Sequence, residues 1–160
     1  MNHACILHVE DDSNDVLLLE YAFKTAGVDN PVQVASDGQQ AIDYLIAATR
    51  AEEPWIHPKP CLVLLDLKLP VKSGLDVLRW ARQQPALSGL PVIVLTSSRD
   101  PIDVSHSYRL GANSFVVKPF DQEQRVRLAR AIKFWWIEHN LCSETWGDSF
   151  EKPPQWAICS

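Results

Sequence analysis

The sequence CLVLLDLKLP, residues 61–70, decides the fold class, because four consecutive aliphatic residues, Leu62 to Leu65, precede a single acid, Asp66. An apolar run without polar alternation is typical of a strand that is covered on both faces, as in a parallel sheet between two layers of helices. The run VIVL at 92–95 has the same character. The sequence therefore predicts an α/β protein with a buried parallel sheet.

Short apolar runs alternate with longer amphipathic segments along the rest of the chain. We predict strands at 4–9, 32–35, 61–65, 91–95 and 114–117, and helices at 14–26, 39–49, 74–84, 101–110 and 122–139. This order is a (βα) unit repeated five times, which predicts a doubly wound, five-stranded parallel sheet. We expect one domain at 1–139 and a C-terminal extension at 140–160.

The composition fits one globular domain and excludes several classes of protein. The chain has 160 residues, 46% of them hydrophobic and 22% charged, with a net charge of -5. An acidic chain is not expected to bind nucleic acid, and no apolar run approaches the roughly 20 residues that a membrane helix needs. Because no signal peptide is visible, we expect a cytoplasmic protein. The four cysteines lack the spacing of metal or redox motifs, so we expect free thiols.

Polar side chains follow four of the predicted strands. Glu10 and Asp11 follow the first strand, Asp66 the third, Thr96 the fourth and Lys118 the fifth. The carboxyl ends of parallel strands meet at one edge of the sheet, where ligands bind in folds of this class. We therefore expect these acids, the hydroxyl and the amine to lie close together.

This set of groups suits phosphoryl chemistry. Clustered carboxylates repel one another and are relieved by a hard divalent cation with oxygen ligands, most plausibly Mg²⁺. Asp66 can then attack a phosphoryl group while the metal and Lys118 neutralise its oxygens and Thr96 donates a hydrogen bond. Any one acid alone is better explained as a helix cap, as we expect for Asp12. Matching groups at four strand ends favour the functional interpretation.

Five short motifs resemble those of the receiver domains of two-component response regulators, over about residues 6–137. The motifs are VEDD at 9–12, LLDLKLP at 64–70, VLTSS at 94–98, LGANSF at 110–115 and VKPF at 117–120. The resemblance implies a flavodoxin-like receiver fold with Asp66 as phosphoacceptor. It also implies an acidic pocket of Glu10 and Asp11, a metal ligand from the backbone carbonyl of Lys68, and a cis bond between Lys118 and Pro119.

The resemblance further implies a switch and not an enzyme, with at most self-phosphorylation and autodephosphorylation activity. Thr96 would move toward phosphorylated Asp66, and the aromatic Phe115 would fill the space that Thr96 leaves. Phe115 has no hydroxyl group, so such a switch would work by packing. A plain core aromatic is an equally good interpretation of Phe115.

Three features resemble the small single-domain regulators that pair with bacterial phytochrome histidine kinases. They are the start VEDDSND at 9–15, the proline-containing loop at 51–60, and the extended C-terminus. This resemblance implies that the phosphoryl donor is a phosphohistidine on a light-sensing kinase, a bacteriophytochrome.

The last predicted helix carries more apolar side chains than one buried face needs. Leu128, Ile132 and Trp135 form one stripe, and five more apolar residues lie elsewhere on the helix, namely Val126, Ala129, Phe134, Trp136 and Ile137. We therefore predict a homodimer through the last helix and the C-terminal extension. The alternative is that the tail folds back over its own domain.

Two rival functions use similar residues or a similar fold. A phosphatase of the haloacid dehalogenase type also uses an Asp nucleophile, but its DxD motif lies on an early strand and its acidic pair comes late. Here Asp66-Leu67-Lys68 lacks the second Asp, and the acidic pair comes first. A nucleotide-binding flavodoxin-like module would need a glycine-rich loop after the first strand, which the sequence lacks.

Overall fold

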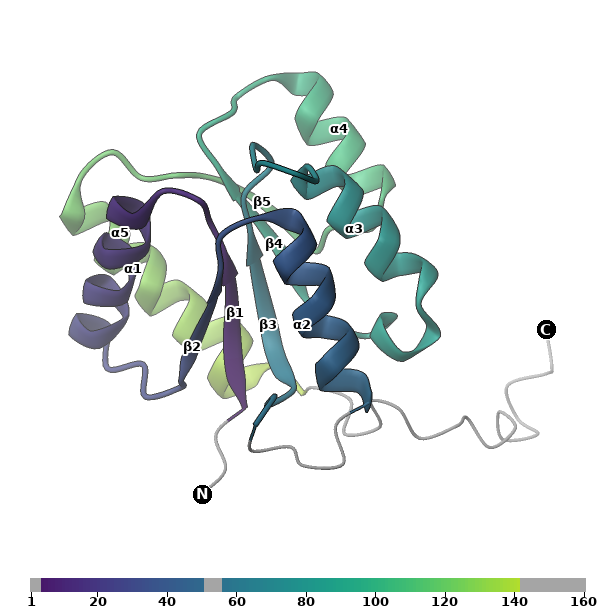
Figure 1. The fold of residues 1–160 in the computed structure, drawn as a ribbon. Coiled ribbons are helices and arrows are strands. Elements are labelled where there is room, and N and C mark those ends of the chain that lie inside the picture. The colour runs from purple at the N-terminus through teal and green to yellow at the C-terminus, as the bar shows by residue number, and fades with distance from the viewer. Residues whose placement is uncertain (1–3, 51–55, 142–160) are drawn as a thin grey trace, which may run out of the picture.

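The structure, a computed structural model, describes residues 4–50 and 56–141 (Figure 1). The strands are β1 Cys5–Val9, β2 Val32–Ala35, β3 Pro60–Leu65, β4 Val92–Thr96 and β5 Ser114–Val117. The helices are α1 Ser13–Ala26, α2 Gly38–Arg50, α3 Gly74–Gln83, α4 Pro101–Arg109 and α5 Gln122–Ile132, with a 3₁₀ turn at Pro85–Leu87 and π-helical turns, η2, at Lys133–His139. The predicted strands and the first four helices match these bounds to within one residue at each end.

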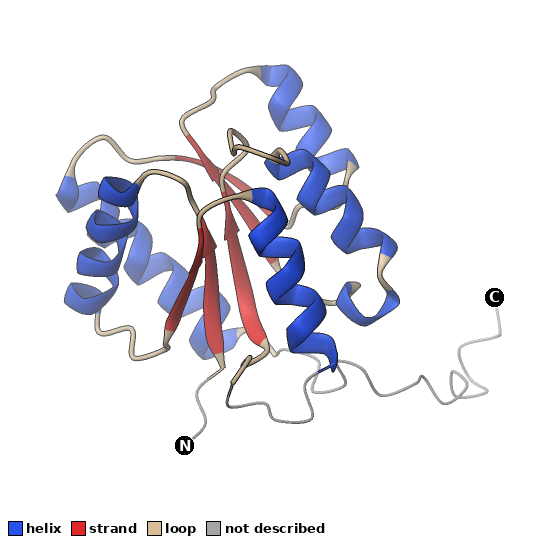
Figure 2. Ribbon diagram, viewed as in Figure 1, coloured by secondary structure: helices blue, strands red, loops and turns tan. Residues whose placement is uncertain are grey.

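All five strands are parallel and follow the order β2-β1-β3-β4-β5, which confirms the predicted fold class. Helices α1 and α5 cover one face of the sheet, and α2, α3 and α4 cover the other (Figure 2). The chain reverses its direction of winding after β2, so the carboxyl ends of β1 and β3 lie side by side at the edge where parallel sheets bind ligands.

The position of the central strand β3 between two layers of helices explains its apolar sequence. Leu62 and Leu64 are buried against α1 and α5, whereas Val63 and Leu65 are buried against α2 and α3. Successive side chains of a strand point to opposite faces, so a strand between two helical layers needs apolar residues at every position. Each fully buried Leu contributes roughly 1.5 to 3 kcal/mol relative to an exposed one.

Local capping chemistry sets the helix ends near the functional edge. Asp12 caps α1, where its carboxylate accepts hydrogen bonds from the N–H groups of Asn14 and Asp15, as predicted. Ser73 and Asp76 form a reciprocal capping box at the start of α3.

Within the described residues, no helix combines the length and the apolar composition that a bilayer crossing requires.

The last helix differs from the prediction of one α-helix over 122–139. It changes to π-helical turns after Ile132, and the wider i→i+5 turns alter which side chains face the sheet. Trp136 and Ile137 pack against the core, while Trp135 is 64% exposed, so Trp135 does not share the buried position of Ile132 with which it was predicted to form a stripe. Most of the expected C-terminal extension lies outside the described residues, and the domain boundary stays a prediction.

The structure describes two of the four cysteines. Cys5 is fully buried in β1, and Cys61 is half-buried at the start of β3. Cys142 and Cys159 lie outside the described residues.

A strained turn lies between β3 and α3. Val71 has a φ of 67°, and the N–H of Lys72 donates a hydrogen bond of 2.8 Å to the carbonyl of Pro70 across it. A β-branched residue is disfavoured at positive φ because its Cβ crowds the backbone. The side chain is 78% exposed and cannot recover this cost by packing.

We expect Val71→Gly to raise the free energy of unfolding by about 1 kcal/mol, because glycine adopts positive φ without the steric cost but loses more backbone entropy on folding. Urea denaturation of the two proteins measures the difference. Val71→Ala is the matched control, since it shortens the side chain but keeps the Cβ. An equal gain in both variants would contradict strain at this position.

Candidate functional site

Backbone hydrogen bonds bring the strand-end residues to one level of the sheet edge. The N–H of Asp66 donates to the carbonyl of Val9 at 3.1 Å, and the N–H of Lys118 donates to the carbonyl of Thr96 at 2.8 Å. The sheet ladder thus continues past the ends of β3 and β5. Asp66 and Thr96 are buried at this edge.

The turn after β3 is held close to α3 by a glycine. The N–H of Gly74 donates to the carbonyl of Leu67 at 2.9 Å, and a Cβ at Gly74 would overlap the carbonyl oxygen of Asp66. Only glycine permits this close approach of two backbones. Gly74, which follows Asp66 in the same motif, therefore allows the start of α3 to pack directly against the backbone of Asp66.

Lys118 is the centre of the site. Its Nζ lies 2.6 Å from Glu10 Oε2, 2.7 Å from Asp66 Oδ2 and 2.9 Å from Asp15 Oδ2. The ammonium donates hydrogen bonds to Asp66 and Asp15, and its contact with Glu10 is an ion pair. The sequence predicted Glu10 and Asp66 here but missed Asp15. The available signal was an acid in the first turn of α1, the helix that starts directly after the acidic pair.

The charges at this site perturb one another. Burial lowers the pKa of Lys118, but its hydrogen bonds to three carboxylates outweigh this and hold the pKa above its ordinary value. Burial raises the pKa of Glu10, and the hydrogen bond from Lys118 opposes that rise. One ammonium cannot balance three carboxylates, so the site keeps a negative excess that a cation would relieve.

Two of the carboxylates that pair with Lys118 also belong to a group of acids that could hold a metal ion. Glu10, Asp11 and Asp66 each offer a carboxylate oxygen, and these atoms lie within 4.8 Å of one another. Three carboxylates at one open edge suit a hard divalent cation that keeps several waters. The N–H of Lys68 donates to Asp66 Oδ1 at 3.3 Å, while the role of the Lys68 carbonyl as a ligand stays a prediction.

The two predicted switch residues lie on neighbouring strands. Thr96 ends β4, and its Oγ1 accepts a hydrogen bond of 3.3 Å from the N–H of Ser98. Phe115 on β5 is half-buried against the α2 and α3 side of the core, and its N–H donates to the hydroxyl of Tyr108 on α4 at 3.2 Å. This packing suits a core aromatic and a switch residue equally.

The expected cis bond between Lys118 and Pro119 is wrong. No peptide bond of the described residues is cis. Trans is the lower-energy isomer of a proline bond, and the Lys118 side chain reaches its three carboxylates in that form.

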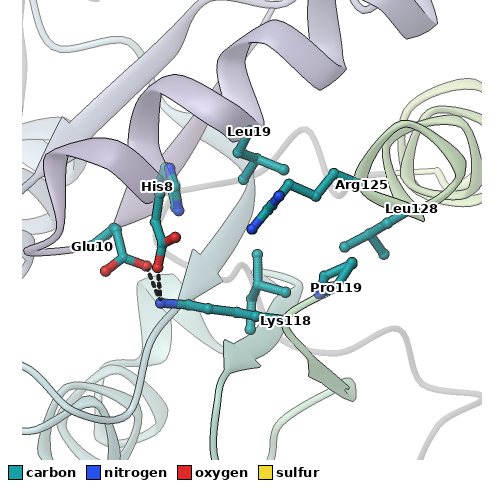
Figure 3. Close-up of a pocket in the computed structure, with 9 residues that line it drawn as sticks. His8, Glu10, Leu19, Lys118, Pro119, Arg125 and Leu128 are labelled. Carbon is teal, nitrogen blue, oxygen red and sulfur yellow. Dashed lines mark hydrogen bonds and ion pairs between the residues drawn. The ribbon is translucent and has the colours of Figure 1, made fainter. Parts of the chain in front are cut away.

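A pocket lies beside Lys118, between the sheet and the layer of α1 and α5. Its cavity volume is about 20 Å³. Its lining, seven residues of which Figure 3 labels, is His8, Glu10, Asp15, Leu19, Leu95, Lys118, Pro119, Arg125 and Leu128. His8 is only 2% exposed, and its Nδ1 has no hydrogen-bond partner among the described residues. Burial and then the charge of Lys118 lower the pKa of His8 to about 4.

Comparison with known proteins finds one matching family model, the response regulator receiver domain, over residues 6–130. The chain is 35% identical over 133 residues to response regulator Rcp1 of Synechocystis, covering 83% of this chain and 88% of Rcp1. The crystal structure of the Mn²⁺-bound form of Rcp1 has a TM-score of 0.76 at 34% identity, over 88% of this chain and 99% of that one.

Two further solved structures are similar. The phosphorylated cyanobacterial phytochrome response regulator RcpA has a TM-score of 0.78 at 32% identity, over 88% of this chain and 98% of that one. The bacteriophytochrome response regulator RtBRR is 40% identical with a TM-score of 0.66, over 86% and 83% of the two chains.

The buried His8 predicts a loss of stability in acid. The unfolded chain protonates His8 below a pH of about 6.5, whereas the folded protein resists protonation down to about 4, so acid favours unfolding. We expect His8→Val to remove a dependence of up to about 1.4 kcal/mol per pH unit within this window. Urea denaturation at several pH values measures the slope.

The exposed His106, changed to Gln, is the control for this comparison. Identical slopes for wild type and His8→Val would contradict a neutral, buried His8.

Proposed function

Because the chain belongs to the response regulator receiver domain family, whose members act as phosphoacceptor switches rather than as catalysts, we propose that Asp66 is its phosphoacceptor and a histidine kinase its donor. The observation that carries this proposal is the Lys118 ammonium, which lies 2.7 Å from Asp66 and 2.6 Å from Glu10 at the acidic edge of the sheet. Among the strand-end carboxylates, Asp66 alone follows the central strand β3, between the acids of β1 and the hydroxyl of β4.

In the proposed reaction a carboxylate oxygen of Asp66 attacks the phosphorus atom of a phosphohistidine. The new O–P bond forms as the P–N bond breaks, and the kinase imidazole leaves with the bond electrons. Lys118 neutralises charge on the phosphoryl oxygens, and the Thr96 hydroxyl donates a hydrogen bond to one of them. The same groups support self-phosphorylation from a small phosphodonor and slow hydrolysis.

Glu10, Asp11, Asp66 and the Lys68 carbonyl would hold the metal ion, which we propose to be Mg²⁺. Receiver domains bind Mg²⁺ or Mn²⁺ at an acidic pocket, and Rcp1 is described in a Mn²⁺-bound form. The three clustered carboxylates of this chain suit either ion. When bound, the ion would neutralise the acidic pocket and the incoming phosphoryl group.

The output would pass through β5 and α4. In our proposal Thr96 moves toward the phosphoryl group and Phe115 follows by packing. The hydrogen bond from the Phe115 N–H to the Tyr108 hydroxyl connects that movement to α4. This bond supports the switch role of Phe115 because it joins the edge strand to a surface helix.

We propose a bacterial phytochrome histidine kinase as the cognate donor. The support is the similarity to RcpA and RtBRR, which are described as phytochrome and bacteriophytochrome response regulators. The rival phosphatase of the haloacid dehalogenase type is not supported, because the family match is to receiver domains over residues 6–130. The expected lack of nucleic-acid binding and the cytoplasmic location stay predictions.

We also propose that the protein forms a homodimer through the last helix and the C-terminal extension. Phe134 and Trp135 are 47% and 64% exposed and contact each other edge to face, with ring centroids 5.1 Å apart. Exposed aromatic pairs are typical of protein interfaces. Trp136 and Ile137 cover the protein's own core, and within the described part of the chain Phe134 and Trp135 stay exposed for contact with a second copy.

The phosphoacceptor is tested with acetyl phosphate and Mg²⁺ by intact-mass analysis. We expect wild type to gain the mass of one phosphoryl group only when Mg²⁺ is present, and Asp66→Asn to gain none, since an amide is a far weaker nucleophile. The matched control is Asp37→Asn, a half-buried acid that follows β2 at the same edge of the sheet. Phosphorylation of Asp66→Asn would refute the assignment.

The dimer is tested by sedimentation velocity over a range of concentrations. We expect Trp135→Ser to weaken self-association at least about tenfold, because buried Trp residues often contribute about 2 kcal/mol or more at interfaces. Ile102→Ser on α4, where Ile102 is 62% exposed, is the control. A monomeric wild type, or equal effects of both substitutions, would rule out this interface.

A further inference from the structure

The pocket beside Lys118 contains two polar groups that the proposed phosphoryl transfer does not use. Arg125 reaches into it from α5, and His8 borders it from β1. Figure 3 shows the Arg125 guanidinium pointing across the pocket toward His8, above the Lys118 side chain. Asp15 of α1 lines the same pocket. A cation from one helix and an acid from the neighbouring helix therefore line the same pocket.

Arg125 has no acidic partner in residues 4–50 and 56–141, because none of the ion pairs found there includes it. The residue is half-buried. A guanidinium that is partly removed from water and unpaired is unfavourable, and its five N–H groups can satisfy several acceptors at once.

Two of the acceptors that border the pocket are candidates for pairing with Arg125. The Nδ1 of His8 is buried without a partner, which typically costs about 1 to 3 kcal/mol. Among the described residues the carboxylate of Asp15 is bound by Lys118 alone, and it lies outside the acidic cluster of Glu10, Asp11 and Asp66 that could share a metal ion.

Phosphorylation of Asp66 would create a conflict at Lys118. A phosphoryl group adds nearly two negative charges and three acceptor oxygens, yet the Lys118 ammonium is already shared among three carboxylates. The contact to Asp15 is the longest of the three, at 2.9 Å, and the Asp15 side chain is 29% exposed, against 7% for Asp66 and 1% for Glu10. Asp15 is therefore the partner whose release costs least.

Building on the proposed phosphoacceptor role of Asp66, we propose that Arg125 is a second cationic residue of this site. Lys118 gives up Asp15 to bind the phosphoryl group, and Arg125 then pairs with Asp15 and donates to His8 Nδ1. Arg125 is a positioning residue, since it acts through Asp15 and does not touch the reacting atoms. The exchange replaces a link between α1 and β5 with a link between α1 and α5.

A double-mutant cycle tests this pairing. The probe is beryllium fluoride with Mg²⁺, a phosphoryl mimic whose dissociation constant is measured by NMR titration of wild type, Arg125→Gln, Asp15→Asn and the double variant. We expect Arg125→Gln to weaken binding about fivefold, as the loss of a partly buried ion pair does. In the Asp15→Asn background the same substitution has no further effect, because the partner is already gone.

Two control variants distinguish the loss of the Arg125–Asp15 ion pair from a general disturbance of folding. Arg127→Gln removes a charge from the same helix at an exposed position paired with Glu123, and we expect binding as in wild type. Arg125→Lys keeps the charge and restores part of the affinity. In wild type the Arg125 Nε–H resonance shifts and its solvent exchange slows on addition of the mimic.

An equal weakening by Arg125→Gln in both backgrounds, or an unchanged Arg125 resonance in wild type, would overturn the inference while leaving the phosphoacceptor role intact. No binding of the mimic by wild type would overturn the proposed function, and this inference with it.

Discussion

The functional edge of this protein depends on the Lys118 ammonium. It holds together carboxylates from β1, α1 and β3, at 2.6 to 2.9 Å, in a place where Glu10 and Asp66 are nearly inaccessible to water. Removal of one partner from a buried pair typically costs about 3 to 5 kcal/mol, because the other charge is left without a counterion. The same arrangement leaves the site short of positive charge. A site that is electrostatically incomplete without a cation or a transferred group is well suited to a switch.

The parallel sheet brings these groups together at one of its edges. Each strand ends at the same edge, and backbone hydrogen bonds extend the ladder one residue beyond the strands, as from Lys118 to Thr96. Below that edge, β3 is apolar on both faces and anchors the site in two separate cores. The chemistry is thus carried by residues just past the rigid elements, whose positions the strands and the close packing at Gly74 fix.

The two helical layers have different roles. The layer of α2 and α3 carries an apolar core, and the layer of α1 and α5 borders a pocket that His8, Asp15 and Arg125 line beside Lys118. The second layer also ends in the π-helical turns that expose Phe134 and Trp135. Any change in how α1 and α5 are linked would therefore act on the same layer that carries the exposed aromatic pair.

The sequence by itself determined the elements and most of the site. Strand and helix bounds follow from side-chain periodicity and capping, and Glu10, Asp66 and Lys118 follow from their places at strand ends, because both signals are local along the chain. Only the tertiary structure decided that Asp15 contacts Lys118, since 103 residues separate them and helix geometry alone does not give that distance. It also decided that Trp136 and not Trp135 faces the core, because a change from α to π turns rotates every later side chain and leaves no clear mark in the sequence.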